Sequence, residues 1–165
     1  MAVAVAVAVA VAVAVATLGS AGACPQGIHC DGSAVPNPGL MGMGAVLTEP
    51  DGTCHTLSQA TTIKGCNNEA ELRALIAGLR EGQAHGAKTL LVYCDSGVLV
   101  EQLGGPGVKP VARLAGLFDE ARALLESFEQ VSLQWIPRHR NAQADALARA
   151  ALGKQPKRVV KASKD

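Results

Sequence analysis

Aromatic side chains and an excess of charge are what this 165-residue sequence most lacks. Its four Phe, Trp and Tyr residues are Tyr93, Phe118, Phe128 and Trp135. They are too few for the rows of base-stacking side chains with which many proteins hold single-stranded nucleic acid. The formal net charge is only +1 at pH 7, which excludes a strongly basic coat or an acidic tail as the main feature of the chain. At this length the sequence has room for one hydrophobic core.

Paired cysteines are missing as well. The five cysteines, an odd number, stand at positions 24, 30, 54, 66 and 94 without a Cys-x-x-Cys pair. This spacing argues against a disulfide framework or a zinc site. Cys30 and Cys94 lie in apolar runs, where a free thiol behaves as a small core side chain. We therefore expect a reducing compartment and a cytoplasmic protein.

The N-terminus is a repeat of two residue types. From Ala2 to Ala16 alanine and valine alternate, and Ala21-Gly22-Ala23 resembles a signal cleavage site. However, no lysine or arginine precedes the repeat, and alanine and valine are weak membrane-insertion residues. We interpret residues 1–25 as a dispensable low-complexity extension and expect no stable membrane association. An export signal or membrane anchor is the alternative.

Charge is unevenly distributed along the chain. Residues 138–165 carry eight lysines and arginines against two acidic residues, whereas residues 1–137 carry seven against twelve. An acidic body with a basic C-terminal end suits a carboxylate site that works beside a polyanion, and it equally suits a solvated tail. We divide the chain into the extension 1–25, a domain at 26–153 and a basic tail at 154–165.

Hydrophobic periodicity predicts the strands of this domain. A short apolar stretch ends near Asp31, and residues 43–48 and 53–63 read as a hairpin around the turn at 49–52. The continuous apolar run at 89–94 is typical of a strand buried on both faces. Residues 131–136 predict a last strand.

Helices are predicted between and after these strands. Apolar residues at 72, 75, 76 and 79 share one helical face, and Asn67-Asn68 opens that helix. Further helices are expected at about 96–103, at 114–128 and, after a loop at 137–140, at 144–151. The order predicts an α/β fold with a mixed five-stranded sheet, three antiparallel strands followed by βα units, flanked by helices.

Four acidic residues stand where these elements begin or end: Asp31, Glu71, Asp95 and Asp145. Each has a structural explanation, because Asn68 and Glu71 have capping-box spacing, Asp145 lies near a helix start, and Asp31 and Asp95 can begin turns. If the two buried strands are neighbours, the four acids share a small volume, where they repel unless cations are bound. Carboxylate oxygens favour Mg²⁺ or Mn²⁺.

The motifs around these acids make the chain from about residue 28 to 152 similar to the type 1 ribonuclease H family. They are Asp31-Gly32-Ser33 with Asn37-Pro38-Gly39, Asn67-Asn68-Glu69-Ala70-Glu71, Asp95-Ser96, and Asn141-Ala142-Gln143-Ala144-Asp145-Ala146-Leu147-Ala148. The resemblance implies a ribonuclease H-like fold and a catalytic domain at 26–153. It also implies Asp31, Glu71, Asp95 and Asp145 as the catalytic residues and as the ligands of two Mg²⁺ ions, with Mn²⁺ as a substitute.

The resemblance further implies a substrate and a reaction. Residues expected to contact the substrate are Gly32, Ser33, Asn37, Asn67 and Asn68, with Asn141 as a further candidate. The implied reaction is hydrolysis of the RNA strand of an RNA–DNA hybrid, leaving 5′-phosphate and 3′-hydroxyl ends. In the two-metal mechanism one ion generates the attacking hydroxide and the other stabilises the leaving 3′ oxygen. A monomer is expected.

The sequence departs from the family pattern in its loops. His139 lies in the loop where the family carries a catalytic histidine, but closer to Asp145 than expected, so we name it a candidate for proton transfer or product release. Gly97 stands where many members carry a polar residue that contacts the substrate. Residues 104–113 lack the family's lysine- and tryptophan-rich protrusion, which predicts weaker binding of hybrids.

Two other functions fit the same residues. One is a related nuclease that acts on a different duplex, such as double-stranded RNA. The other is a non-catalytic nucleic-acid-binding module of the same fold, although four clustered acids without metal would repel the phosphates being bound.

Overall fold

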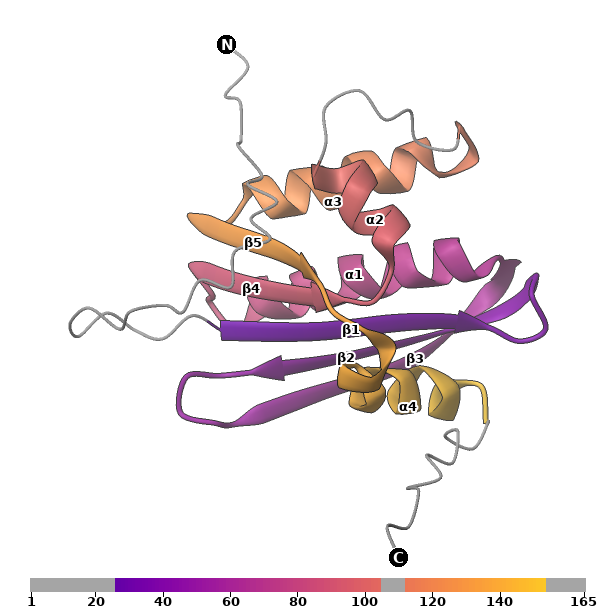
Figure 1. Cartoon of the computed structure of the whole chain (residues 1–165), viewed down its shortest axis with the longest axis horizontal. Coiled ribbons are helices and arrows are strands. Elements are labelled where there is room, and N and C mark those ends of the chain that lie inside the picture. Colours follow the sequence, from indigo (N-terminus) through magenta and orange to yellow (C-terminus); the bar gives the residue numbers. More distant parts are fainter. Residues whose placement is uncertain (1–25, 105–111, 154–165) are drawn as a thin grey trace, which may run out of the picture.

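A five-stranded mixed sheet forms the centre of the domain, with the strands in the order β3-β2-β1-β4-β5 (Figure 1). The strands are β1 (Gln26–Ala34), β2 (Gly39–Thr48), β3 (Cys54–Gly65), β4 (Thr89–Cys94) and β5 (Gln130–Trp135). The pairs β1–β2 and β2–β3 are antiparallel, whereas β1–β4 and β4–β5 are parallel. The predicted sheet, three antiparallel strands followed by βα units, is confirmed.

This computed structural model describes residues 26–104 and 112–153. The predicted extension at 1–25 and the predicted basic tail at 154–165 lie outside the described residues. So do residues 105–111, which make up most of the segment expected to lack the basic protrusion. Within the described ranges no helix is both long and apolar enough to span a membrane.

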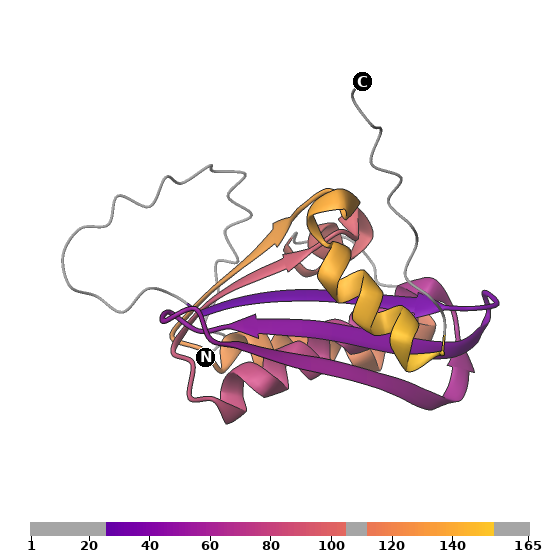
Figure 2. The same cartoon turned by 90° about the horizontal axis from the view of Figure 1, so that it is seen from below.

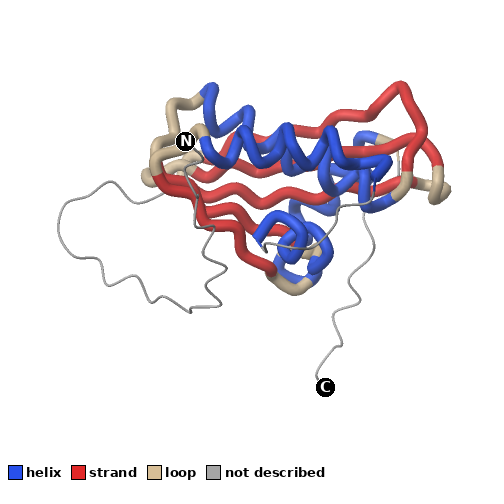
Figure 3. Tube along the Cα trace, turned by 90° about the horizontal axis from the view of Figure 1, so that it is seen from above, coloured by secondary structure: helices blue, strands red, loops and turns tan. Residues whose placement is uncertain are grey.

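Helices cover both faces of the sheet. They are α1 (Asn67–Ala84), α2 (Gly97–Gly104), α3 (Ala115–Glu126) and α4 (Ala142–Ala151), with short 3₁₀ turns at Ala112–Leu114 and Arg138–Arg140. Helix α1 packs on β1 and β2 and against α3, and α4 packs on β1, β2 and β3. Figures 2 and 3 show that α4 lies on the side of the sheet opposite α1. The second 3₁₀ turn replaces most of the loop predicted at 137–140.

The main hydrophobic core lies between the sheet and helices α1 and α3. The predicted inner face of α1 is confirmed, because Leu72, Leu75 and Leu79 are fully buried and Ile76 nearly so. Opposite them lie apolar side chains of β1, β2, β4 and β5 and of α3. Burying a side chain of this size contributes about 1.5–3 kcal/mol, so this face fixes α1 firmly along the sheet.

Strand β4 differs from its prediction. It was expected to be buried on both faces, but its burial alternates: Leu90, Val92 and Cys94 are buried, whereas Leu91 and Tyr93 are partly exposed. The reason is that α4 packs over β1, β2 and β3, and no described helix packs extensively on that face of β4. The ring of Tyr93 instead stacks on His29, with centroids 4.8 Å apart.

Candidate active site

Strands β1 and β4 bring Asp31 and Asp95 to the same edge of the sheet. The two strands are parallel neighbours, and His29 of β1 pairs with Tyr93 of β4. Asp31 and Asp95 follow this pair by two residues each. Because parallel strands run in the same direction, the two carboxylates emerge side by side, as the sequence predicted.

Helix α1 brings Glu71 to these two acids through a close approach at Gly32. A Cβ atom at Gly32 would lie 2.1 Å from the carbonyl oxygen of Ala70 and 2.4 Å from the backbone nitrogen of Glu71. Only glycine leaves room for the first turn of α1 to pass directly over β1. As a result, carboxylate oxygens of Asp31, Glu71 and Asp95 lie within 4.8 Å of one another. We call these three residues the carboxylate cluster.

Asp145 lies at the edge of the carboxylate cluster, in the first turn of α4. Helix α4 comes close because Gly44 pairs with Asp31 across the sheet, and a Cβ atom at Gly44 would lie 2.2 Å from the carbonyl oxygen of Ala144. Asp145 is near enough to raise the pKa of Asp31 through a side-chain hydrogen bond and through its charge. Its own oxygens accept from Nε of Arg149 at 3.1 and 3.2 Å.

The electrostatics of the cluster centre on Asp31, which is 7% exposed. Burial first, then the charge of Asp95, then the hydrogen bond and charge of Asp145 and the charge of Glu71, raise the pKa of Asp31 to about 8. Burial is also the main cause that raises the pKa of Glu71, opposed by a hydrogen bond from Ser96 and by the charge of Arg138. Without a cation, the cluster therefore holds protons at a pH where isolated carboxyl groups are ionised.

The donor set fits hard divalent cations. All the groups that meet at the cluster are carboxylates, and bound positive charge removes the repulsion that raises the pKa of Asp31. Mg²⁺ and Mn²⁺ prefer oxygen ligands of this kind. Asp31, Glu71 and Asp95 are therefore the residues that would hold such ions, with Asp145 beside them.

Asn141 occupies a different place from the substrate contact that the sequence suggested. Its side chain is 1% exposed, and its Nδ2 donates to Oδ2 of Asp95 and to the backbone oxygen of Cys30, both at 2.9 Å. As the residue just before α4, an asparagine is expected to cap the helix, but it makes no side-chain cap here. It fixes the Asp95 carboxylate from inside the protein and joins the start of α4 to β1.

The other predicted substrate residues lie around the turn between β1 and β2. Asn37, Asn67 and Asn68 are exposed and Ser33 is half-buried. Oδ1 of Asn67 accepts from the backbone N–H of Ala34 at 2.8 Å, and Oδ1 of Asn37 accepts from that of Asn67 at 3.2 Å. These bonds tie the turn to the start of α1. Gly32 serves the packing of α1, as described above.

His139 lies in the 3₁₀ turn Arg138–Arg140, which follows β5 after two residues. All three side chains of the turn are exposed. The turn borders the carboxylate cluster, because the charge of Arg138 acts on Glu71 and the turn runs into Asn141. His139 is thus solvated and beside the cluster rather than inside it.

Two neighbours of the cluster had no role assigned from the sequence. Ser96 is buried and hydrogen-bonds Glu71, while its Oγ accepts from the backbone N–H of Leu99 at 3.3 Å. Trp135 is 55% exposed, and its Nε1 donates to the backbone oxygen of Asp95 at 3.2 Å. Their only sequence signals were the serine after Asp95 and a single tryptophan at the end of the last strand.

Comparison with known sequences places the chain in a family. The profile of the family described as "Reverse transcriptase-like" matches residues 29–151. The Bifunctional protein Rv2228c of Mycobacterium tuberculosis is 38% identical over 126 residues, which are 76% of this chain and 35% of that protein. This chain therefore spans about a third of that relative. The Ribonuclease H of Cyanothece sp. is 32% identical over 143 residues, which cover 78% of this chain and 90% of that protein.

Solved structures agree with this placement. The N-terminal RNase H domain of Rv2228c from M. tuberculosis superposes with a TM-score of 0.72 at 38% identity, covering 78% of this chain and 98% of that one. LC11-RNase H1, solved in complex with an RNA/DNA hybrid, gives a TM-score of 0.69 at 30% identity, covering 78% and 96%. With this fold and these relatives, the chain belongs to the ribonuclease H family of enzymes.

Proposed function

We propose that this chain is a divalent-metal-dependent endoribonuclease that hydrolyses the RNA strand of RNA–DNA hybrids and leaves 5′-phosphate and 3′-hydroxyl ends. The observation that carries the proposal is the meeting of Asp31, Glu71 and Asp95 within 4.8 Å. Asp31 lies in β1 and Glu71 in α1, and Asp95 is the residue directly after β4. Three elements that are far apart in the sequence thus place their carboxylates close together. The most buried of these, Asp31, has a raised pKa. Such tuning is typical of functional sites.

The chain's own residues organise the chemistry. Asp31, Glu71 and Asp95 would hold the cations, and a bound cation would favour the ionised form of Asp31. When bound, two such cations supply an activated water and stabilise the leaving 3′ oxygen. Asn141 keeps the Asp95 carboxylate in one orientation, and Ser96 does the same for Glu71. Asp145 lies where it can join the ligand set once its pairing with Arg149 is exchanged for a cation.

A related protein and the surface next to the carboxylate cluster both support an RNA–DNA hybrid as the substrate. The related LC11-RNase H1 was solved with an RNA/DNA hybrid. In this chain, exposed polar side chains at Asn37, Asn67 and Asn68 flank the start of α1, next to Glu71. Small polar groups of this kind suit contacts to a 2′-hydroxyl, the group that separates RNA from DNA. His139, in the exposed turn beside the cluster, is part of the proposal as a proton-transfer or product-release residue.

A cleavage assay tests the proposal. A hybrid labelled on its RNA strand is incubated with Mg²⁺ and either the wild-type chain, Asp31→Asn or the matched control Asp119→Asn, which changes an exposed carboxylate of α3. We expect cleavage by the wild type and by Asp119→Asn, and loss of cleavage in Asp31→Asn. Equal activity of Asp31→Asn and the wild type would refute the site.

Parallel substrates test the remaining parts of the proposal. Double-stranded RNA and DNA duplexes should stay intact, and preferential cleavage of one of them would reassign the substrate while keeping the site. Tight binding of the hybrid without cleavage in Mg²⁺ or Mn²⁺ would instead indicate a binding module. We also propose that residues 26–153 form the catalytic unit of a monomeric, cytoplasmic protein. Fractionation of the tagged chain and light scattering test location and oligomeric state.

A further inference from the structure

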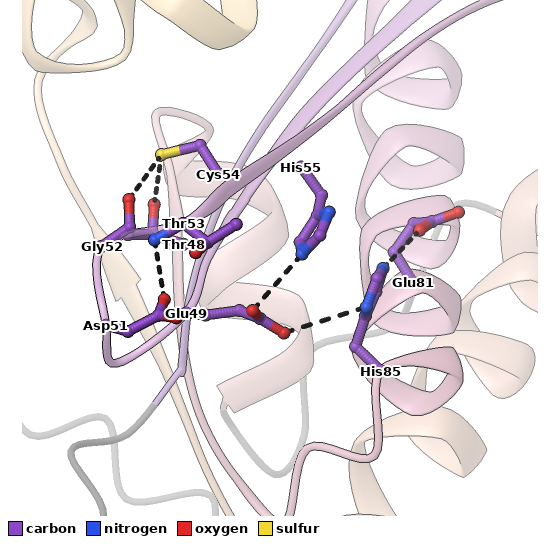
Figure 4. A network of polar contacts seen from close by, with 9 residues as sticks. All are labelled: Thr48, Glu49, Asp51, Gly52, Thr53, Cys54, His55, Glu81 and His85. Atoms are coloured by element: carbon purple, nitrogen blue, oxygen red, sulfur yellow. Dashed lines mark hydrogen bonds and ion pairs between the residues drawn. The ribbon is translucent and has the colours of Figure 1, made fainter.

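A second group of metal-ligating side chains lies at the other end of α1 (Figure 4). Glu49 follows β2, His55 lies in β3, and His85 is the residue that ends α1. One ligand atom of each lies within 4.8 Å of the others. We call these three residues the histidine cluster. From Glu71 to His85 the helix rises about 20 Å at 1.5 Å per residue, so this cluster is separate from the carboxylate cluster.

The side chains of the histidine cluster lie close together but do not form good hydrogen bonds with one another. Nε2 of His55 lies 3.5 Å from Oε2 of Glu49, and Nδ1 of His85 lies 3.9 Å from Oε1 of Glu49. Both distances exceed those of good hydrogen bonds. Nε2 of His55 is buried and has no hydrogen-bond partner among the described residues. The two imidazole rings stack with centroids 4.1 Å apart.

We propose that Glu49, His55 and His85 bind a divalent transition-metal cation, Zn²⁺ in the first place. Two imidazole nitrogens and one carboxylate oxygen are a common protein ligand set for Zn²⁺, with a fourth position left for water. Mg²⁺ disfavours such a set because it takes oxygen ligands. A cation between these groups replaces the long contacts of Glu49 and supplies the missing partner of His55 Nε2.

Glu81 supports this assignment from the outer side of His85. Its Oε2 lies 3.5 Å from Nε2 of His85, and Figure 4 shows His85 between Glu81 and Glu49. A carboxylate beside one ring nitrogen is placed to accept a hydrogen bond from it when the other nitrogen binds a metal, and such a bond fixes the orientation of the ring. Nδ1 of His85, which faces Glu49, is therefore the ligand atom.

The missing Cys-x-x-Cys pairs do not weigh against this site. That argument concerns thiolate ligands, and the ligands here are imidazoles and a carboxylate. Cys54 is next to His55 in sequence, but its sulfur lies 3.8 Å from Oγ1 of Thr48 and 3.6 Å from the backbone oxygen of Gly52. Figure 4 shows it pointing away from the two histidines.

Binding there would connect the β2–β3 hairpin to the end of α1. A ligand that binds only the folded state stabilises it in proportion to the logarithm of its concentration over Kd. The consequence is stabilisation of this end of the molecule by Zn²⁺, independent of the hydrolytic site.

Calorimetric titration of the full chain with Zn²⁺ in excess Mg²⁺ tests the proposal, because Mg²⁺ occupies the carboxylate cluster. The variants are His55→Gln, His85→Gln, Glu81→Gln and the matched control His139→Gln. We expect one tight Zn²⁺ site in the wild type and in His139→Gln. Its affinity should fall by about 100-fold or more in the two cluster variants and by about 10-fold in Glu81→Gln. Equal affinity in all the chains, or no tight site in the wild type, would overturn the proposal.

Co²⁺ gives a second measurement, which does not depend on how well a variant folds. The visible spectrum of the wild-type chain loaded with one Co²⁺ should lack thiolate-to-cobalt charge-transfer absorption. Such absorption would overturn the assignment by placing the ion on a cysteine. Circular dichroism of each variant without metal checks its fold, and Glu49→Gln replaces any histidine variant that fails to fold.

Discussion

The two ends of helix α1 carry two kinds of ligand group. At its start, three carboxylates crowd together around the buried Asp31, whose pKa is raised to about 8. At its end, two stacked imidazoles and Glu49 lie together, with Glu81 beside them. The same helix and sheet thus build one group made of carboxylates alone and one that contains two imidazole rings.

The two proposed sites differ in the kind of metal that they would bind. Crowded carboxylates repel one another, so they gain from a hard cation that neutralises them. Imidazoles carry no such repulsion when neutral and select a borderline cation through their nitrogens. The first site is proposed to serve hydrolysis and the second to stabilise the fold.

The largest contrast is expected from the same substitution at the two ends of α1. Glu71→Gln removes a ligand of the carboxylate cluster and should lower hybrid cleavage by about 100-fold or more, since even outer partners of a metal site are worth 10- to 100-fold. Glu81→Gln should leave cleavage within about twofold. Initial rates of cleavage in saturating Mg²⁺ measure the two effects. Similar losses of activity in the two variants would contradict the separate roles of the two ends of α1.

Asn141→Ala tests whether the carboxylate cluster depends on support from inside the protein. The substitution removes the bonds to Asp95 and to Cys30 and should lower the free energy of unfolding by about 1–3 kcal/mol. It should also lower cleavage, because Asp95 loses its fixed orientation. Denaturant unfolding and cleavage rates check this, with Gln143→Ala, at an exposed position of the same helix, as the control. If Asn141→Ala changed neither the free energy of unfolding nor the cleavage rate, Asn141 would not support the Asp95 carboxylate.

The raised pKa of Asp31 predicts an unusual dependence of stability on pH. Between its ordinary pKa of about 4 and its folded value of about 8, the folded state binds a proton that the unfolded state releases. The metal-free protein should therefore lose stability as the pH rises through this window.

The matching variant makes this prediction quantitative. Asp31→Asn should exceed the wild type in free energy of unfolding by at least about 1.4 kcal/mol at pH 8, the equivalent of one pKa unit. The gap should shrink toward pH 4 and close when Mg²⁺ is added to the wild type. Chemical unfolding at several pH values measures it. If the wild type were more stable than Asp31→Asn at pH 8 without metal, the difference in free energy of unfolding would have the opposite sign and would contradict the prediction.

Among the residues in or next to the carboxylate cluster, the smallest effect is expected from Trp135→Phe. It removes the bond from the indole to the backbone oxygen of Asp95, and because Trp135 is largely exposed, the loss should be about 0.5 kcal/mol. Cleavage should fall by a few-fold, since the backbone of Asp95 is held less firmly. A variant as impaired as Glu71→Gln would mean that Trp135 itself contacts the substrate.

The sequence predicted the elements and the acids because both leave local signals. The spacing of Leu72, Leu75 and Leu79 set the inner face of α1, and the apolar runs that precede Asp31 and Asp95 indicated where carboxylates meet. The orientation of Asn141 could not be predicted, because the same position also suits a helix cap or a surface contact. Nor could the one-sided burial of β4, which depends on where α4 packs.

The histidine cluster left no sequence signal for a similar reason. Glu49, His55 and His85 belong to a turn, a strand and a helix end, and no motif joins them. Only the packing of α1 along the sheet brings the end of the helix to the β2–β3 hairpin.

Anomalous scattering from crystals soaked in Mn²⁺ would show where a divalent cation binds this protein. We expect strong manganese peaks among the carboxylate oxygens of Asp31, Glu71 and Asp95. Clear manganese density elsewhere, at Glu49, His55 and His85 for example, with none among those three acids, would contradict this expectation.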